Sequence, residues 1–263
     1  MKGPRRAALV FLVALGCICV FPRLVTPADY AQQLRDAPDA SPSAEHVLGT
    51  DALGRDRLAR LVYGTRISLS LAPAAALLTT LLAALIGGFG GFAGGWVERA
   101  VMAAADLVLS LPWLFLLITV RAFLPLNVAP MISVTITFAL LGCLGWAAAA
   151  RVICADVRTL RESDFVLLAH ATGCGRLRLL WRHVLPNLRP ILLAQFWISI
   201  PVFILTEANL GILGLGVAEP LPSWGGLLVE LESFSSLASQ PWLLAPLLLL
   251  VLTVVCFQTV LQG

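Results

Sequence analysis

The chain has 263 residues, of which 59% are hydrophobic and 13% are charged, whereas soluble globular domains carry about 25% charged residues. This composition excludes a soluble protein and predicts an integral membrane protein. The net charge of +3 gives no reason to expect a nucleic-acid partner, because the arginines matter by their location rather than by their sum.

Six apolar runs predict an all-α membrane protein with about six transmembrane helices. The first run, residues 7–21, follows Lys2, Arg5 and Arg6. We expect residues 1–22 to form an uncleaved anchor, although a cleaved signal peptide is the alternative. The other predicted spans are residues 67–92, 100–120, 130–150, 190–206 and 242–261. An even number of spans places both termini on the cytoplasmic side.

Residues 23–66 are polar and nearly neutral, as an external loop can be, with six arginines and six acidic residues. The spacing of Leu53, Leu58, Leu61 and Val62 predicts a short amphipathic helix that enters the next span along the outer interface. Two readings of the charges stay open, a rigid turn with local Asp and Arg pairing and a contact with a partner.

Two features of the second and third spans bear on helix packing. Gly87, Gly91 and Gly95 recur every fourth residue, so that another helix backbone can approach closely along this face. Asp106 lies inside the third predicted span, less than two turns from its inner end. An acidic residue within a span is a functional candidate, but at this depth we expect a structural role.

The stretch 151–189 carries seven arginines against three acidic residues, which predicts a cytoplasmic loop. Ser163 can cap a helix, and Gly173 suits the left-handed position that ends it. A second helix is expected from Arg176 to Leu185, stopped by Pro186. Arg178 and Arg182 would share one face of this helix, where an acidic partner or lipid phosphates could neutralise them. The alternative is a positive loop that only orients the protein.

Residues 207–241 are too apolar for a free loop and too interrupted by glycine and proline for a span. We expect a folded external cap or a re-entrant element buried in protein.

The chemistry that the sequence lacks narrows the function. A phosphate-binding P-loop requires a lysine after its glycines, and the only lysine is Lys2. No span carries the buried charges of an ion relay, and no residues have the spacing of a metal site. We therefore expect no cofactor, no metal and no enzymatic activity, with transport energy supplied by a partner.

Several motifs in chain order resemble one family, the second permease subunit of ABC importers for dipeptides, oligopeptides and nickel. They are Leu48 to Asp56, Tyr63 to Ser68, Gly94 to Arg99 with Asp106 and Pro112, Arg161 to Val166 with Ala169 and Gly173, Arg182 to Asn187, Glu207 with Ala208, Leu213 to Val217, and Pro222 to Gly225. The resemblance implies a type I ABC importer permease fold, with residues 67–263 as its core. It also implies an inner-membrane location and a loop at 151–189 that docks into the cytoplasmic ATPase.

The resemblance suggests three groups of functional residues. The ATPase coupling loop would comprise Arg161, Glu162, Asp164, Phe165, Val166, Ala169, Gly173, Arg178, Arg182, Leu185, Pro186 and Asn187. Helix packing would involve Gly87, Gly91 and Gly95. An external motif would contain Gly49, Thr50, Asp51, Gly54, Arg55, Asp56, Glu207, Pro222, Ser223, Trp224 and Gly225.

The implied partners are a homologous permease subunit, ATPase subunits that bind the ATP, an extracytoplasmic solute-binding protein and membrane lipid. Leu168 and His170 stand where the family usually has alanine and arginine, and the chain stops at Gly263 where the family continues with a polar tail. A membrane subunit that does not transport, or one of export type, is the alternative function. An intramembrane enzyme lacks support, because no span offers a nucleophile with a base.

Overall fold

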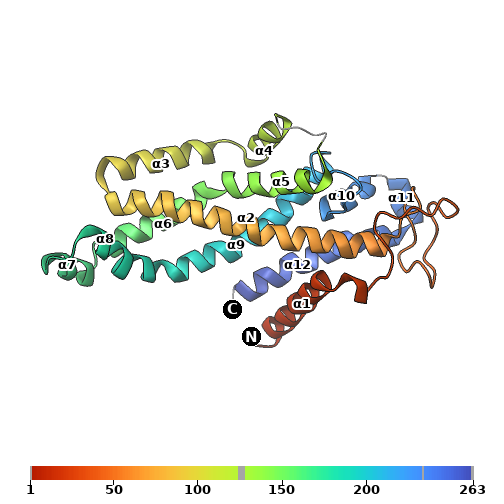
Figure 1. Cartoon of the computed structure of the whole chain (residues 1–263), viewed down its shortest axis with the longest axis horizontal. Coiled ribbons are helices and arrows are strands. Elements are labelled where there is room, and N and C mark those ends of the chain that lie inside the picture. The colour runs from red at the N-terminus through yellow and green to blue at the C-terminus, as the bar shows by residue number, and fades with distance from the viewer. Residues whose placement is uncertain (1, 124–127, 233, 262–263) are drawn as a thin grey trace. The chain divides into compact units, whose positions relative to one another are not determined.

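The computed structural model describes residues 2–123, 128–232 and 234–261 (Figure 1). Within these ranges the regular structure is helical, apart from an isolated β-bridge between Thr50 and Asp56, and residues 25–56 are mostly turns and loops. The longer helices are α1 (Lys2–Val20), α2 (Arg57–Ala93), α3 (Gly95–Ser110), α4 (Trp113–Ala122), α5 (Pro130–Leu144), α6 (Trp146–Arg161), α7 (Asp164–Ala171), α9 (Arg189–Ile212) and α12 (Ala245–Leu261). Short helical segments are η1 (Pro22–Leu24), α8 (Arg176–Leu179), η2 (Leu180–Val184), η3 (Leu185–Leu188), α10 (Trp224–Leu228), η4 (Val229–Glu232), α11 (Phe234–Ser239) and η5 (Pro241–Leu244).

Five helical stretches of the described chain are long and apolar enough to cross a membrane, and the bent pair α3 and α4 makes a sixth. The five are Gly3–Val20, Arg57–Ala93, Pro130–Arg161, Arg182–Ile212 and Pro241–Leu261. The prediction of an all-α membrane protein with about six spans is confirmed.

The third predicted span is broken rather than straight, which corrects the expectation for residues 100–120. Helices α3 and α4 meet at an angle of 85°. Leu111, between them, has the extended angles φ −81° and ψ 133°. Pro112 follows it, and proline disfavours the helical conformation for the preceding residue.

The short amphipathic helix expected before the second span is not a separate element. Helix α2 begins at Arg57 and continues for 37 residues to Ala93. Leu53 lies outside it and is exposed, while Leu61 and Val62 are buried within its first turns. No proline separates residues 57 and 67, and Gly64 lies inside the helix in close contact with Ser223 and Leu227, so the amphipathic turns and the span form one helix,.

Two loop boundaries also differ from the prediction. Helix α6 continues to Arg161, so the loop that we expect to be cytoplasmic, called the inner loop below, begins at residue 162 rather than at 151. Helix α9 continues to Ile212, so Glu207 belongs to this helix and not to the irregular segment that follows it. The helix ends where Gly214 adopts φ +72°, since glycine enters the left-handed conformation without a steric penalty.

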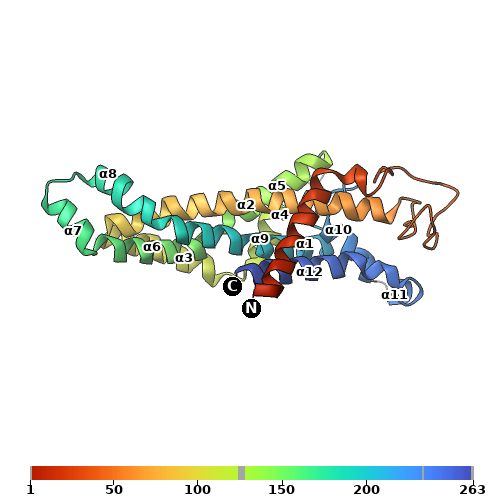
Figure 2. The ribbon, with the colours of Figure 1, turned by 90° about the horizontal axis from the view of Figure 1, so that it is seen from below.

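The chain divides into two compact units. The first comprises Met1–Pro73, Val120–Phe138 and Ile200–Gly263, and in it α1 packs against α12 (Figures 1 and 2). The second comprises Ala74–Thr119 and Ala139–Ser199, and in it α3 packs against α6.

Candidate functional site

The inner loop of the second unit is anchored by a buried apolar cluster. Val166 of α7, Leu179 of α8 and Leu188 of η3 are each at most 3% exposed. They share this cluster with Ile153 and Val157 of α6. Burying side chains of this size stabilises the loop by about 1.5–3 kcal/mol each, so the loop is a packed part of the unit.

The other side of α7 presents large apolar side chains to the surroundings. Phe165, Leu167 and Leu168 are 44%, 55% and 66% exposed. Helix α7 follows the polar pair Glu162 and Ser163 and does not belong to any apolar span. An exposed apolar group on a short helix outside the spans is typical of a protein contact surface.

The corner between the two loop helices is formed by Gly173. Its φ is +84°, a conformation that a residue with a Cβ resists at about 1 kcal/mol or more. The amide of Cys174 donates to the carbonyl of Ala169, which closes the end of α7. A Cβ added at Gly173 would meet no atom within 4 Å, so the need for glycine here comes from the backbone angle alone.

The second loop helix differs from the prediction of one α-helix over 176–185. Only Arg176–Leu179 is α-helical, and the path continues through the π-helical η2 and the 3-10 helix η3 into α9. Pro186 therefore does not stop the helical path. It occupies the first turn of η3, where its missing N–H leaves no hydrogen bond unmade.

Polar side chains of the loop have two kinds of environment. Ser163 Oγ donates to the carbonyl of Leu160 at 2.5 Å, instead of accepting from the first turn of α7. Asn187 Nδ2 donates to the carbonyl of His183 at 2.6 Å. Arg178 and Arg182 are exposed, and no ion pair involves either of them within the described residues. Glu162, Asp164, Leu185 and Pro186 are exposed, and Ala169 is half-buried.

Two arginines near the end of α6 bind the end of α2 and the beginning of α3. Arg161 Nη1 donates to the carbonyl of Gly91 at 3.2 Å, and Arg158 pairs with Glu98 at 3.3 Å. Further along, Arg151 pairs with Asp106 at 2.9 Å, with both side chains half-exposed. Sequence reasoning did not identify Arg151 as the partner of Asp106, because the two residues lie on different helices, α6 and α3, 45 positions apart in the chain.

Two glycines of α2, Gly87 and Gly91, lie against α6. A Cβ at Gly91 would stand 2.5 Å from the carbonyl oxygen of Cys154 and 2.9 Å from Cβ of Val157, and one at Gly87 would clash with the carbonyl of Ala150. Gly95 does not share this face. It lies in α3 with φ +58°, and a Cβ there would meet nothing within 4 Å.

A second polar site lies in the first unit, in the segment before α2. Asp51 accepts hydrogen bonds from the backbone N–H of Leu53 and of Arg55, and from Arg55 Nε at 2.7 Å. Thr50 Oγ1 donates to the carbonyl of Ala37 at 2.5 Å. Asp56 Oδ1 accepts from the N–H of Ala59 at 2.7 Å, which caps the start of α2. Gly49 and Gly54 adopt φ +71° and +72° in the turns of this segment.

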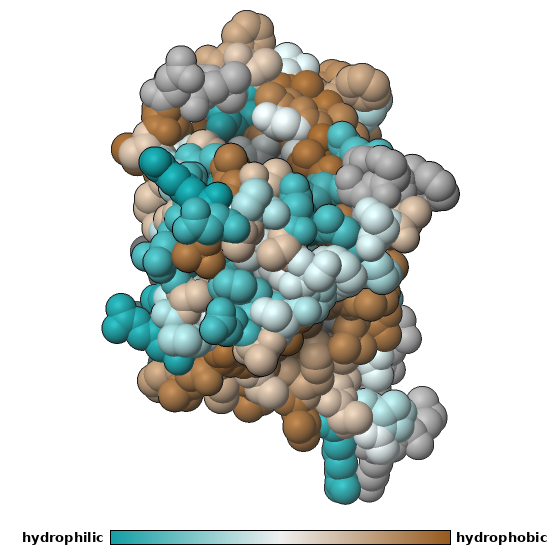
Figure 3. All heavy atoms as spheres, turned by 90° about the vertical axis from the view of Figure 1, so that its right-hand side faces the viewer, coloured by the Kyte–Doolittle hydropathy of each residue, from teal (hydrophilic) through white to brown (hydrophobic). Residues whose placement is uncertain are grey.

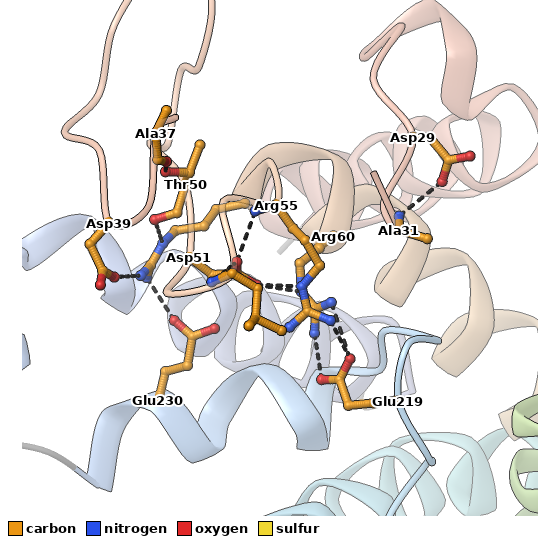
Figure 4. Close-up of polar contacts among 12 residues, drawn as sticks. Asp29, Ala31, Ala37, Asp39, Thr50, Asp51, Arg55, Arg60, Glu219 and Glu230 are labelled. Carbon is orange, nitrogen blue, oxygen red and sulfur yellow. Dashed lines mark hydrogen bonds and ion pairs between the residues drawn. The ribbon is translucent and has the colours of Figure 1, made fainter. Parts of the chain in front are cut away.

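This turn is also joined to the segments around α10 by long-range ion pairs (Figure 4). Arg55 Nη1 and Arg60 Nη2 contact Glu219 at 2.5 and 2.8 Å. Arg57 Nη1 contacts Glu230 at 2.7 Å. The arginines of this segment therefore pair with distant glutamates as well as with neighbouring aspartates. Sequence reasoning identified neither Glu219 nor Glu230.

The two glutamates respond oppositely to these surroundings. Burial alone would raise the pKa of Glu219, but the hydrogen bonds and charges of Arg60 and Arg55 outweigh it, and the pKa lies below its ordinary value. For Glu230, burial dominates over the attraction of Arg57, and the pKa is raised. The network borders a cavity of about 490 Å³ that Asp39, Glu230 and Glu232 help to line. In Figure 3, which looks onto this end of the chain, hydrophilic side chains gather in the middle of the face.

The Pro222 to Gly225 motif is fastened to α2 and α9 within the same unit. Trp224 is fully buried, and its Nε1 donates to Thr65 Oγ1 at 2.9 Å. Ser68 Oγ donates to Glu207 Oε2 at 3.3 Å. Ser223 Oγ accepts from the N–H of Gly226 and caps α10. A Cβ at Gly225 would lie 2.7 Å from the carbonyl of Glu207, so glycine is required for this close approach.

Residues 67–262 match the family of the inner membrane component of binding-protein-dependent transport systems. This chain belongs to that family. The match covers both units, including the loop around α7 and the segment that carries α10.

Curated relatives in the family are peptide permeases. The chain is 33% identical to the oligopeptide transport system permease protein OppC of Bacillus subtilis over 89% of the chain and 74% of that protein. It is 30% identical to OppC of Haemophilus influenzae over 98% of the chain and 82% of that protein. It is 29% identical to the dipeptide transport system permease protein DppC of Bacillus subtilis over 98% of the chain and 78% of that protein. The chain is thus a multi-pass permease subunit of an ABC importer, and it is not an enzyme.

Proposed function

We propose that this permease forms half of a translocation pathway for peptides or peptide-like solutes, together with a homologous permease subunit. The names of the OppC and DppC relatives support peptides as the solute class. The single lysine at position 2 leaves the chain without a P-loop of its own, so ATP is hydrolysed by separate cytoplasmic subunits.

We place the contact with the ATPase at the inner loop, and the observation that carries this assignment is the two-sided character of α7. Its buried residue Val166 holds the helix on α6, while Phe165, Leu167 and Leu168 remain exposed. Large apolar side chains of this kind form the buried core of protein interfaces. The exposed Arg178 and Arg182 would meet acidic residues at the rim of the same contact.

The packing of the loop provides a route for the coupling. Val166, Leu179 and Leu188 are in one buried cluster with residues of α6. Closely packed side chains have low compressibility and transmit displacement. Movement of α7 by closing ATPases would therefore shift α6, and the pathway between the two permeases would open or close.

In this proposal, the ion-pair network before α2 contacts the binding protein that delivers the solute. The network joins the turn at Asp51 to Glu219 and Glu230, and it borders a cavity lined by both charged and apolar side chains. Such a rigid, charged surface suits a transient partner that is recognised by complementary charge.

The experiment compares Gly173→Val with Gly175→Val in the assembled transporter. Both glycines have open space where a Cβ would lie, but only Gly173 has a positive φ. Valine at 173 is expected to distort the corner and to lower solute-stimulated ATP hydrolysis and uptake several-fold at matched protein level. Valine at 175 should leave both activities nearly unchanged, and Gly173→Asn should restore part of them, because asparagine tolerates the left-handed conformation.

Normal uptake by Gly173→Val would mean that the loop only orients the protein. If the complex hydrolysed ATP but took up no peptide, both with the unchanged chain and with the variants, the result would support the alternative of a subunit that does not transport.

A further inference from the structure

A cavity of about 510 Å³ lies where the end of α1 meets the beginning of α2, within the first unit. Its walls are the segment from Val20 to Leu24 on one side and Tyr63 and Arg66 of α2 on the other. Figures 1 and 2 both show η1, which follows α1, beside the first turns of α2. This cavity is not lined by any residue that we assigned to the ATPase contact or to solute reception.

The arginines between residues 23 and 66 divide into two groups by their partners. Arg55, Arg57 and Arg60 form the ion pairs of the network. Arg23 and Arg66 are exposed, and the described residues provide no ion pair for either of them. The neighbouring Asp29 accepts a hydrogen bond from the N–H of Ala31 at 2.9 Å. Two guanidinium groups on one cavity, without a countercharge, favour an anionic ligand.

The same cavity is apolar on the side of α1. Val20, Phe21 and Leu24 are 64%, 58% and 84% exposed. Only 11% of the membrane-crossing window of α1 is buried, against 28% to 39% for the other four helical windows. An anion that fits both walls must carry a long apolar portion as well as its charge.

The position of the cavity along the span agrees with the level of lipid headgroups. It begins at the last turn of α1, whose window Gly3–Val20 is long enough to cross the hydrocarbon layer,. The rings of Tyr63 and Tyr30 pack against each other at a tilt of 49°, with centroids 5.0 Å apart, and tyrosine is enriched at the boundary between membrane and water. The two arginines therefore lie at the boundary where phosphate groups are found.

We propose that this cavity binds the phosphate of an anionic phospholipid, with Arg23 and Arg66 as the donors and the acyl chains along the exposed face of α1. A guanidinium presents two parallel N–H groups to a pair of phosphate oxygens, which makes arginine well suited to this contact. The site rests on the geometry of the first unit and on the membrane-spanning family, and it does not depend on the solute or on the ATPase contact.

The test uses the full chain, purified with its co-expressed partner subunits in mild detergent. Native mass spectrometry would count retained phosphatidylglycerol and phosphatidylcholine in the unchanged protein, in Arg23→Gln/Arg66→Gln and in Arg35→Gln. Arg35 is the matched control, because it is an exposed arginine of the same loop without an ion pair in the described residues and lies outside the cavity. The double variant should bind phosphatidylglycerol about tenfold more weakly or worse, and Arg35→Gln should bind it normally.

Two further arms identify the ligand. Soluble glycerol phosphate at the same concentration should fail to compete, because it lacks the apolar portion. A photoreactive phenylalanine at Leu24, which is more exposed than Val20 and Phe21, should crosslink to lipid. Equal retention by the double variant, equal loss in Arg35→Gln, effective competition by glycerol phosphate or a crosslink to another protein subunit would each overturn the proposal.

Discussion

Arg60 holds Glu219 across 159 positions of the chain, with Nη2 donating to Oε1 at 2.8 Å. Arg60 is almost fully buried, whereas the side chain of Glu219 is 59% exposed. The buried guanidinium of Arg60 is therefore paired with a carboxylate at the protein surface, and the contact depends on pH because Glu219 can be protonated.

Glu219→Gln is expected to lower the stability of the first unit by about 1–2 kcal/mol at neutral pH. This value lies between that of exposed pairs and that of buried ones, because only Arg60 is enclosed. Asp51, 3.7 Å from Arg60, replaces part of the lost attraction. Thermal unfolding of the purified variant beside the unchanged protein measures the difference.

The same comparison across pH has a definite sign. The pKa of Glu219 is lowered on folding, so its contribution is fully present above the ordinary glutamate value of 4.5 and is lost as pH falls through the lowered pKa. The raised pKa of Glu230 gives the opposite slope, with its contribution lost as pH rises through that pKa. A Glu219→Gln difference that grew on acidification would contradict this account.

Gly91→Leu should destabilise the second unit by about 1–3 kcal/mol or more, because the new side chain meets the backbone of α6 at Cys154,. Gly88→Leu is the matched control, since it lies one turn away on α2 in open space. Thermal unfolding in detergent would show the loss for residue 91 alone. Equal stability of the two variants would mean that α2 and α6 do not pack as described.

Val166→Ala should loosen the inner loop by about 2 kcal/mol, because two buried methyl groups are lost from the cluster on α6,. Leu167→Ala, next to it but exposed, should leave the stability of the loop unchanged and should weaken the ATPase contact instead. Hydrogen exchange of the α7 amides measures the first effect, and co-purification of the ATPase measures the second.

Single cysteines at Ser41 and Thr172, in a background without the native cysteines, should react with an impermeant reagent from opposite sides of the membrane. Both positions are exposed. Ser223 is unsuitable for this purpose, because it is 1% exposed and caps α10. Reaction of both cysteines from the same side would contradict the expectation of a cytoplasmic loop at 162–188.

The sequence was sufficient to predict the class of fold, because membrane-length apolar runs and proline and glycine positions act locally. The positive φ of Gly173 was predicted in this way, from a single residue. The predictions of a straight third span and of a separate helix before residue 67 were wrong. Both depend on whether consecutive helical turns form one continuous helix, which the local sequence does not decide.

The polar site was less accessible to sequence reasoning. Asp51 and Arg55 lie four residues apart, and their pairing could be expected. Glu219 and Glu230 find their arginines only after the chain has returned through several spans, and no local pattern marks such a contact. The position of Glu207 within a helix was also missed, because the length of α9, which continues to Ile212, was underestimated.

The packing of α1 against α12 has a consequence for biosynthesis. Helix α1 ends at Val20 and α12 begins at Ala245, so the two are synthesised about 10–45 s apart at the usual rate of ~5–20 residues per second. During this interval the first helix enters the bilayer without its packing partner, and it must remain there on the strength of its own hydrophobicity. A chain truncated before residue 245 would lack α12, so the surface of α1 that packs against α12 would stay uncovered. This uncovered surface is a feature that membrane quality control could recognise.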